Sequence, residues 1–153
     1  MASTEHARRN AASHIESIRA LWIAYRVATC EAELEDYENT DEAGGILSDC
    51  DGSEEEVLER VYEYPLSVDL RGGWYPLGDP AAVEPEEYRI ILTCGGPSLE
   101  LRGDVGHRAG PVGHPKVCYA DAWQGERRYL TYGEDSEALN WFVGILAALA
   151  VYF

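Results

Sequence analysis

The sequence predicts an α+β domain in which an antiparallel meander of four to five strands is packed by a long N-terminal helix, a short second helix and a C-terminal helix. The hydrophobic pattern repeats with a helical period through residues 1–63 and again through residues 133–153, but with a period of two through residues 64–132. Strands that follow one another without intervening helices favour an antiparallel sheet. A length of 153 residues fits a single domain with one hydrophobic core.

A long helix is predicted over residues 4–38. Apolar side chains recur there at intervals of three and four residues, which places them on one face, and alanine fills most of the other positions. The apolar face comprises Ile15, Ile18, Leu21, Trp22, Tyr25 and Leu34. Gly44-Gly45 is then expected to break the chain, because glycine is a poor helix former.

A short second helix is predicted over Glu54–Tyr62. Ser53 and Glu56 have the spacing of a capping box, and acidic residues fill the first turn, where they complement the helix dipole. Pro65 prevents the helix from continuing. The residues expected to point inward are Val57, Leu58 and Val61.

Strands rich in Val, Ile, Leu and Tyr follow. The four predicted strands are Leu66–Arg71, Tyr88–Thr93, Ser98–Gly103 and Lys116–Trp123, with Arg127–Tyr132 as an edge strand. Cys94–Pro97 contains two glycines and is expected to form a tight turn, while residues 72–85 and 106–115 are expected to be loops.

The C-terminal helix is predicted from Glu137 to about Val151, with Ser136 as its N-cap. The apolar stretch Ala138–Phe153 is only 16 residues long. About 20 apolar residues are needed to span a bilayer, so this stretch is interpreted as a buried helix and no membrane partner is expected. Met1–Arg9 has no apolar segment typical of a signal peptide, and the four cysteines form no CxxC pair, so reduced thiols in a cytoplasmic protein are expected.

Negative charge is concentrated in one part of the chain. The formal net charge is −16, and residues 31–63 carry fourteen acidic residues against the single base Arg60, a net charge of −13. Like charges four residues apart on a helix repel each other, so the segment tolerates a cost of about 0.2–0.5 kcal/mol per pair. The concentration is consistent with a solvated face, with adaptation to salt, or with a surface that imitates nucleic-acid phosphates.

The imitation of phosphates has a geometric basis. Duplex DNA carries one charge per about 1.7 Å of its axis, and a helix rises about 1.5 Å per residue, so an acid at every second or third position approaches that density. Two loop aromatics either cover the edge of the core or contact a partner. The candidate partner-binding residues are Glu31, Glu35, Asp36, Glu38, Asp41, Glu42, Glu54, Glu55 and Glu59, together with Trp74 and Tyr75.

Other functional classes are less well supported. Direct binding of nucleic acid is disfavoured, because the acidic segment repels phosphate and the later arginines alternate with acids. No catalytic motif is found, and no metal or cofactor is expected. A zinc-compatible ligand set exists, but its spacing matches no known motif. This set comprises Cys94, His107, His114 and Cys118.

Two ordered strings of residues carry a resemblance to a known family. They are Pro65–Tyr75 (PLSVDLRGGWY) and Glu84–Pro97 (EPEEYRIILTCGGP), with a shorter match at Tyr119–Trp123. In these strings the chain resembles a family of small acidic proteins encoded by phages, prophages and other mobile elements. The resemblance implies a mobile-element setting and transfers no catalytic residue.

These observations together favour a non-enzymatic acidic protein that acts in the cytoplasm of a host cell. The expected function is inhibition of a basic nucleic-acid-binding host protein, such as a CRISPR effector or a restriction enzyme, by an anionic surface that imitates DNA. One alternative is a structural or assembly component that associates through an apolar surface such as the C-terminal helix. Another is a small metal-dependent enzyme. The oligomeric state is left open.

Overall fold

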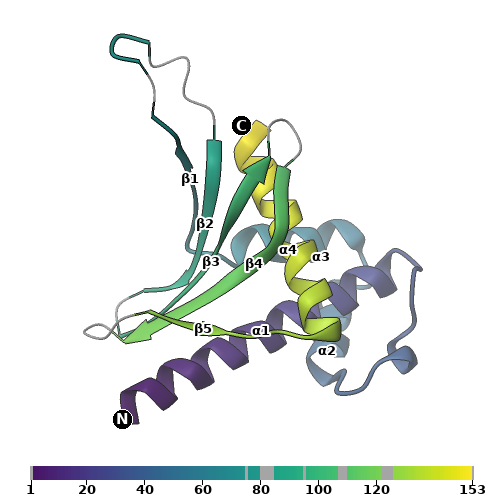
Figure 1. The fold of residues 1–153 in the computed structure, drawn as a ribbon. Helices are drawn as coiled ribbons and strands as arrows, with labels where there is room; N and C mark the ends of the chain where they lie inside the picture. The colour runs from purple at the N-terminus through teal and green to yellow at the C-terminus, as the bar shows by residue number, and fades with distance from the viewer. Residues whose placement is uncertain are drawn as a thin grey trace.

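A layer of helices covers one face of a five-stranded antiparallel sheet whose strand order is β1-β2-β3-β4-β5 (Figure 1). The structure is a computed structural model that describes residues 2–74, 76–79, 85–94, 96–106, 110–121 and 126–152. The order of elements is that of an α+β protein with a meander, so the predicted fold class is confirmed.

The first helix, α1 (Ala2–Ala28), ends ten residues before the predicted boundary. Cys30 adopts a left-handed φ of 62°, and the Glu31 N–H donates to the Arg26 carbonyl at 2.8 Å, which closes the last turn. Thr29 Oγ1 also donates to the carbonyl of Tyr25 at 3.0 Å. The prediction of one helix through residue 38 is therefore wrong, because the helix is capped at its C-terminus soon after Ala28. Leu34 lies instead in a 3-10 helix, η1 (Leu34–Asp36), and packs against the core from there.

Helix α2 (Asp41–Asp49) runs through Gly44-Gly45, so the predicted break at these glycines is also wrong. Tertiary packing outweighs the poor helix propensity of glycine, because Ala43 and Ile46 are buried on the face that contacts α1. Helix α3 (Glu54–Glu63) begins where predicted, with Ser53 Oγ accepting the Glu56 N–H at 3.4 Å. Its inward side chains are as expected, since Val57 and Val61 are fully buried and Leu58 is half-buried.

All five predicted strands are present, with changed boundaries. They are β1 (Ser67–Gly72), β2 (Pro85–Thr93), β3 (Pro97–Gly106), β4 (Gly110–Asp121) and β5 (Arg127–Tyr129). The predicted loop over residues 106–115 is largely wrong, because β4 already pairs with β3 at Pro111 and Val112. Gly113, at a φ of 70°, lies beside the register shift that lets this strand continue. Trp123, the predicted end of the strand, lies outside the described residues.

Helix α4 (Gly133–Tyr152) begins four residues earlier than predicted. Ser136 therefore lies inside the helix, and its assignment as the N-cap is wrong. The apolar residues of α4 face the core, and those recorded as buried are Ala138, Leu139, Phe142, Val143, Leu146 and Ala147. Within the described part of the chain, no helix has both the length and the apolar character required to cross a membrane.

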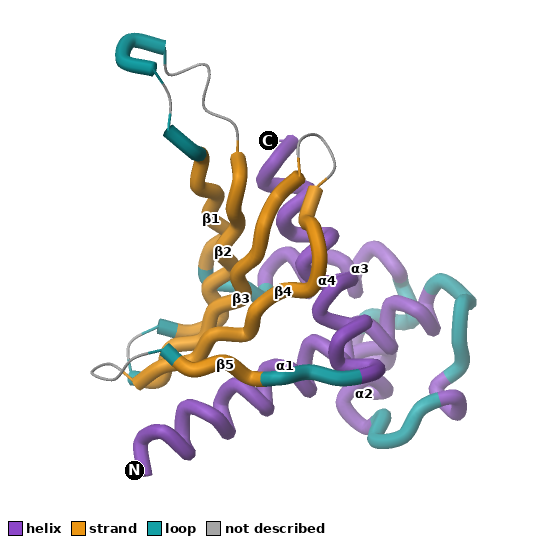
Figure 2. The backbone as a smooth tube through the Cα atoms, viewed as in Figure 1, coloured by secondary structure: helices purple, strands orange, loops and turns teal. Residues whose placement is uncertain are grey.

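The sheet has an apolar inner face and a polar outer face. Alternate residues of the strands are buried under α1 and α4, including Tyr88, Ile90, Leu92, Leu99, Leu101, Val105, Val117 and Tyr119. Helices α2 and α3 and the 3-10 helix η1 pack against α1 rather than on the sheet, and Figure 2 shows them at the right of the molecule. We call residues 31–63, which form this part, the helical lobe.

Candidate functional site

The helical lobe holds the acidic residues on which the prediction of partner binding depends. Every one of its fourteen acidic side chains is exposed. They are Glu31, Glu33, Glu35, Asp36, Glu38, Asp41, Glu42, Asp49, Asp51, Glu54, Glu55, Glu56, Glu59 and Glu63. Two of them form ion pairs in the described structure: Asp49 with Arg60 at 3.1 Å, and Glu31 with Arg26 of α1 at 3.9 Å.

Glu31, Glu35, Glu38 and Glu42 are spaced by three and four residues, but they do not lie on one helix. Glu31 lies in the turn after α1, Glu35 in η1, Glu38 in the following linker and Glu42 in α2. Because the chain changes direction between these positions, their spacing of three and four residues places nothing on a shared helical face. The spacing argument holds only within α3, where Glu55 and Glu59 are one turn apart.

The structure instead gathers carboxylates around a groove between α2 and α3. The groove has a volume of about 650 Å³, and its floor includes Leu21 of α1. Its wall contains three acids, Glu42, Asp49 and Glu63, against the single base Arg60. Asp49 and Glu63 were not among the predicted binding residues, because only the packing of α2 on α3 brings them beside Glu42.

Two further carboxylates, those of Glu54 and Glu31, lie near Tyr25 of α1. The Tyr25 hydroxyl donates a hydrogen bond to Glu54 Oε1 at 3.3 Å. Burial, the charge of Glu54 and the charge of Glu31 all raise the pKa of Tyr25. Leu21 and Tyr25 are four residues apart on α1, about one helical turn, so the groove and this second pair adjoin each other.

Tyr64 lines the groove together with Ser17, and His14 lies beside Tyr64. Burial, which is the largest cause, and the charge of Glu42 raise the pKa of Tyr64 to about 12, against a hydrogen bond to Ser17 that lowers it. His14 Nδ1 lies 2.6 Å from Tyr64 Oη, and burial lowers the pKa of His14. A neutral His14 imidazole that accepts a hydrogen bond from the Tyr64 hydroxyl fits both the raised pKa of Tyr64 and the lowered pKa of His14. This pair therefore serves packing at the base of α3.

The two predicted aromatics do not join the helical lobe. Trp74 is fully exposed, with a relative accessibility of 105%, so the alternative that it covers the core is wrong. It follows the end of β1 by two residues. Tyr75 lies outside the described residues.

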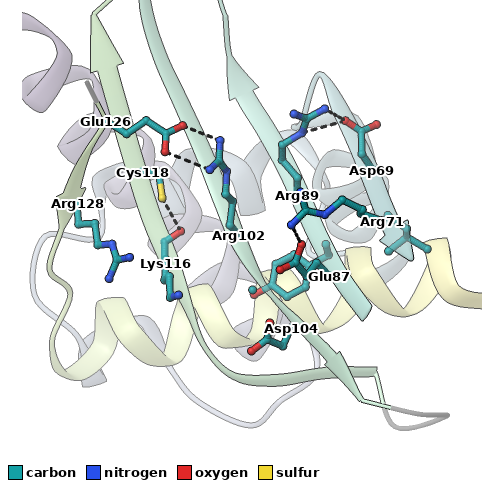
Figure 3. A pocket seen from close by; sticks show the side chains of 13 residues that line it. Asp69, Arg71, Glu87, Arg89, Arg102, Asp104, Lys116, Cys118, Glu126 and Arg128 are labelled. Atoms are coloured by element: carbon teal, nitrogen blue, oxygen red, sulfur yellow. Dashed lines mark hydrogen bonds and ion pairs between the residues drawn. The ribbon is translucent and has the colours of Figure 1, made fainter. Parts of the chain in front are cut away.

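A second candidate site, the sheet groove, lies on the polar outer face of the sheet (Figure 3). It has a volume of about 690 Å³ and presents basic side chains from all five strands. The basic residues are Arg71, Arg89, Arg102, Lys116 and Arg128, and the acidic residues that line it are Asp69, Glu87, Asp104 and Glu126. The sequence contained a signal for this face, namely the alternation of charged residues along β1, β2 and β3.

Most of the charge in the sheet groove is neutralised internally. Arg89 pairs with Asp69 at 2.8 Å, and Arg102 pairs with Glu126 at 2.6 Å, as drawn in Figure 3. Arg71 pairs with Glu87, and Arg102 also pairs with Glu100 at 2.6 Å. Among the described residues, Lys116 and Arg128 form no recorded ion pair. The face is therefore close to neutral.

Cys118 is not an activated nucleophile in this groove. Burial, followed by the charge of Glu126, raises the pKa of the Cys118 thiol. Because the thiolate is the reactive form, a raised pKa keeps this cysteine protonated and inert. All four cysteines of the chain are free.

The zinc-compatible residues do not come together. Cys118 lies on the sheet groove, whereas His114 Nδ1 accepts a hydrogen bond from Asn140 Nδ2 of α4 at 2.7 Å. Cys94 is exposed at the end of β2, and His107 lies outside the described residues. Within the described ranges, no group of three or more His, Cys, Asp or Glu side chains could hold a metal ion.

Comparisons of the chain with protein-family models, with curated proteins and with solved structures gave no match.

Proposed function

We propose that this protein is a non-enzymatic binding protein that occupies the basic groove of a nucleic-acid-binding protein with its helical lobe. The observation that carries the proposal is the exposure of all fourteen acids in residues 31–63, a segment with a net charge of −13. A cationic partner would relieve the repulsion among these carboxylates and would be steered toward them at low salt.

The arrangement of the lobe supports one continuous contact surface. The groove acids Glu42, Asp49 and Glu63 lie around Leu21, and Glu54 and Glu31 lie near Tyr25, one helical turn further along α1. The surface is thus assembled from α2, α3 and the turn after α1, not from one long helix. Such a surface imitates phosphates by charge density, and it differs in shape from a single anionic rod.

The near-neutral charge of the sheet groove argues against a nucleic acid as the partner. Three of its five bases are already paired with carboxylates, so it offers little charge to a nucleic acid. We therefore keep protein, and not DNA or RNA, as the partner.

The resemblance to phage and mobile-element proteins suggests the class of host protein that is bound. A mobile element benefits from blocking a host defence protein that binds DNA or RNA, such as a CRISPR effector or a restriction enzyme. The inhibitor would then act in the cytoplasm of the host cell.

The two alternatives gain no support. Assembly through the apolar C-terminal helix would need free apolar surface there, but the described apolar side chains of α4 from Ala138 to Ala147 largely face the core. A metal-dependent enzyme would need a ligand cluster, and the described residues contain none.

The test is capture of a partner from a nuclease-treated bacterial lysate at low salt, with stepwise salt elution and competition by a duplex oligonucleotide. The lobe variant carries four lysine substitutions, Glu42→Lys, Glu54→Lys, Glu55→Lys and Glu59→Lys. The control variant changes the net charge equally at exposed acids outside the lobe, with Glu5→Lys, Glu16→Lys, Asp104→Lys and Glu137→Lys.

The expected result is that a basic nucleic-acid-binding protein is retained by the wild type and by the control variant, but not by the lobe variant. The duplex should displace it, because both ligands occupy one groove. Retention by the lobe variant, or indifference to the duplex, would rule out the proposed mode of binding.

A further inference from the structure

Strand β1 forms an edge of the sheet whose outer side is free. It pairs with β2 along one side, and in the described part of the chain no strand pairs with the other. An edge strand presents unpaired backbone N–H and C=O groups, to which another strand can add. Figure 1 shows β1 at the outer margin of the sheet.

Two devices that commonly block an edge strand, a proline and a bulge, are absent within β1. The bulge in this ladder falls on β2, since Arg71 pairs with Glu87 and Gly72 with Pro85, which leaves Glu86 unpaired. Strand β1 itself is regular from Ser67 to Gly72 and contains neither proline nor lysine. Its backbone can therefore accept a further strand without rearrangement.

We propose that two copies of the protein pair through β1, antiparallel and edge to edge, about a two-fold axis at Leu70. In an antiparallel pair, directly opposite residues lie on the same face of the sheet. The axis at Leu70 places Asp69 of each copy opposite Arg71 of the other. A symmetric interface of this kind must be self-complementary, and these two residues make it so.

The charges select this register over its neighbours. A shift of the axis by one residue toward the N-terminus would place Asp69 opposite Asp69, and a shift toward the C-terminus would place Arg71 opposite Arg71. Like charges directly opposite on neighbouring strands are destabilising. Only the axis at Leu70 makes both cross-strand pairs attractive.

Both residues of the proposed cross-strand contact already form ion pairs on the outer face of the sheet. Asp69 already pairs with Arg89 at 2.8 Å, and Arg71 pairs with Glu87. The Arg71 side chain nevertheless remains 78% exposed, so it can reach a second carboxylate across the edge. Pairing would thus join two neighbouring ion pairs of each copy into one network of alternating charge.

Exposed apolar residues at both ends of β1 fit the same register. Leu66 is 62% exposed directly before β1, and Trp74 is fully exposed two residues after it. Counted from Leu70, they lie four residues before it and four after it, so the two-fold axis places Leu66 of one copy opposite Trp74 of the other. Burial of these side chains would favour association.

The test uses two charge-reversed variants and their mixture. Sedimentation equilibrium of the wild-type chain from micromolar to submillimolar concentration should show a monomer–dimer equilibrium. Asp69→Arg alone or Arg71→Glu alone should weaken the dimer by about tenfold or more, because two attractive cross-strand pairs become repulsive. An equimolar mixture of the two variants should restore association as a heterodimer, because each altered charge then faces its opposite.

Arg127→Glu is the matched control for Arg71→Glu, since it makes the same charge change at an exposed site on β5, the opposite edge of the sheet. It should leave the dimer unchanged. A wild-type chain that stays monomeric throughout the concentration range would overturn the proposal. So would single variants that associate as tightly as the wild type, or a mixture that forms no heterodimer.

Discussion

Replacement of Gly103 by alanine tests the packing of the sheet directly. Gly103 on β3 pairs with Tyr88 on β2, and the tyrosine side chain lies across the glycine. A Cβ atom at Gly103 would lie 2.4 Å from Tyr88 Oη and 2.6 Å from Tyr88 Cζ. Both distances are well inside van der Waals contact, and Tyr88 is 2% exposed, so the methyl group fits only if the buried ring shifts.

Gly103→Ala should therefore lower the free energy of unfolding substantially. Over-packing of a buried site costs about 1–3 kcal/mol, and we expect about 2–3 kcal/mol because the clash involves the rigid aromatic ring. For a chain of this length, such a loss lowers the melting temperature by about 4–12 °C. Urea denaturation and calorimetry measure both quantities.

Two comparisons isolate the cause. Gly144→Ala in α4 meets no atom within 4 Å and removes a glycine from a helix interior, so it should stabilise the fold by about 0.5–1 kcal/mol. In a Tyr88→Leu background the cost of Gly103→Ala should largely vanish, because the shorter side chain no longer crosses the glycine. If Gly103→Ala is neutral in the wild-type background, the proposed contact with Tyr88 is refuted.

Three further predictions concern the helices. Ser53→Ala removes the acceptor of the Glu56 N–H and should lower the free energy of unfolding, measured in urea, by about 1 kcal/mol. The control Ser48→Ala, at an exposed serine, should change it by less than about 0.5 kcal/mol. Equal effects of the two substitutions would contradict the capping role of Ser53. Burial lowers the pKa of His14 below 6.5, so the folded state favours the neutral imidazole, and the stability that depends on this group is present above that value and is lost as the pH falls below it. His14→Gln should remove this part of the acid destabilisation. The prediction is disproved if the difference in the free energy of unfolding between about pH 7 and about pH 5 is the same in the variant as in the wild type. Phe142 is fully buried with its ring 5.8 Å from that of Tyr64, so Phe142→Ala should cost about 3–5 kcal/mol in thermal unfolding, and a loss below about 1 kcal/mol would mean that it is not a core residue.

Local signals predicted the type and order of the elements well. Ser53 capped α3 as expected, and the period of two from Tyr88 to Thr93 was that of a strand with one buried face. The buried pair Val57 and Val61 also followed from spacing alone. These features are local, because caps and periodicity act through residues that are close in sequence.

One error arose at a local C-terminal cap, and another where non-local contacts outweighed local propensity. Alanine-rich sequence favoured helix beyond residue 28, but left-handed Cys30 ends α1 and redirects the chain. Gly44-Gly45 favoured a break, yet buried Ala43 and Ile46 hold α2 together across it. The packing against α1 decides the course of α2, and a window of a few residues contains no information about it.

The sequence by itself determined that this is one acidic α+β protein with a meander, and that its negative charge is concentrated before the first strand. The tertiary structure alone decided which charges meet. It placed the acids in a lobe of three short helical segments, and it placed bases from five strands on one face, where most of them pair with acids. Composition fixes how much charge a segment carries, whereas Coulomb interactions depend on distances between residues that only the folded chain brings together.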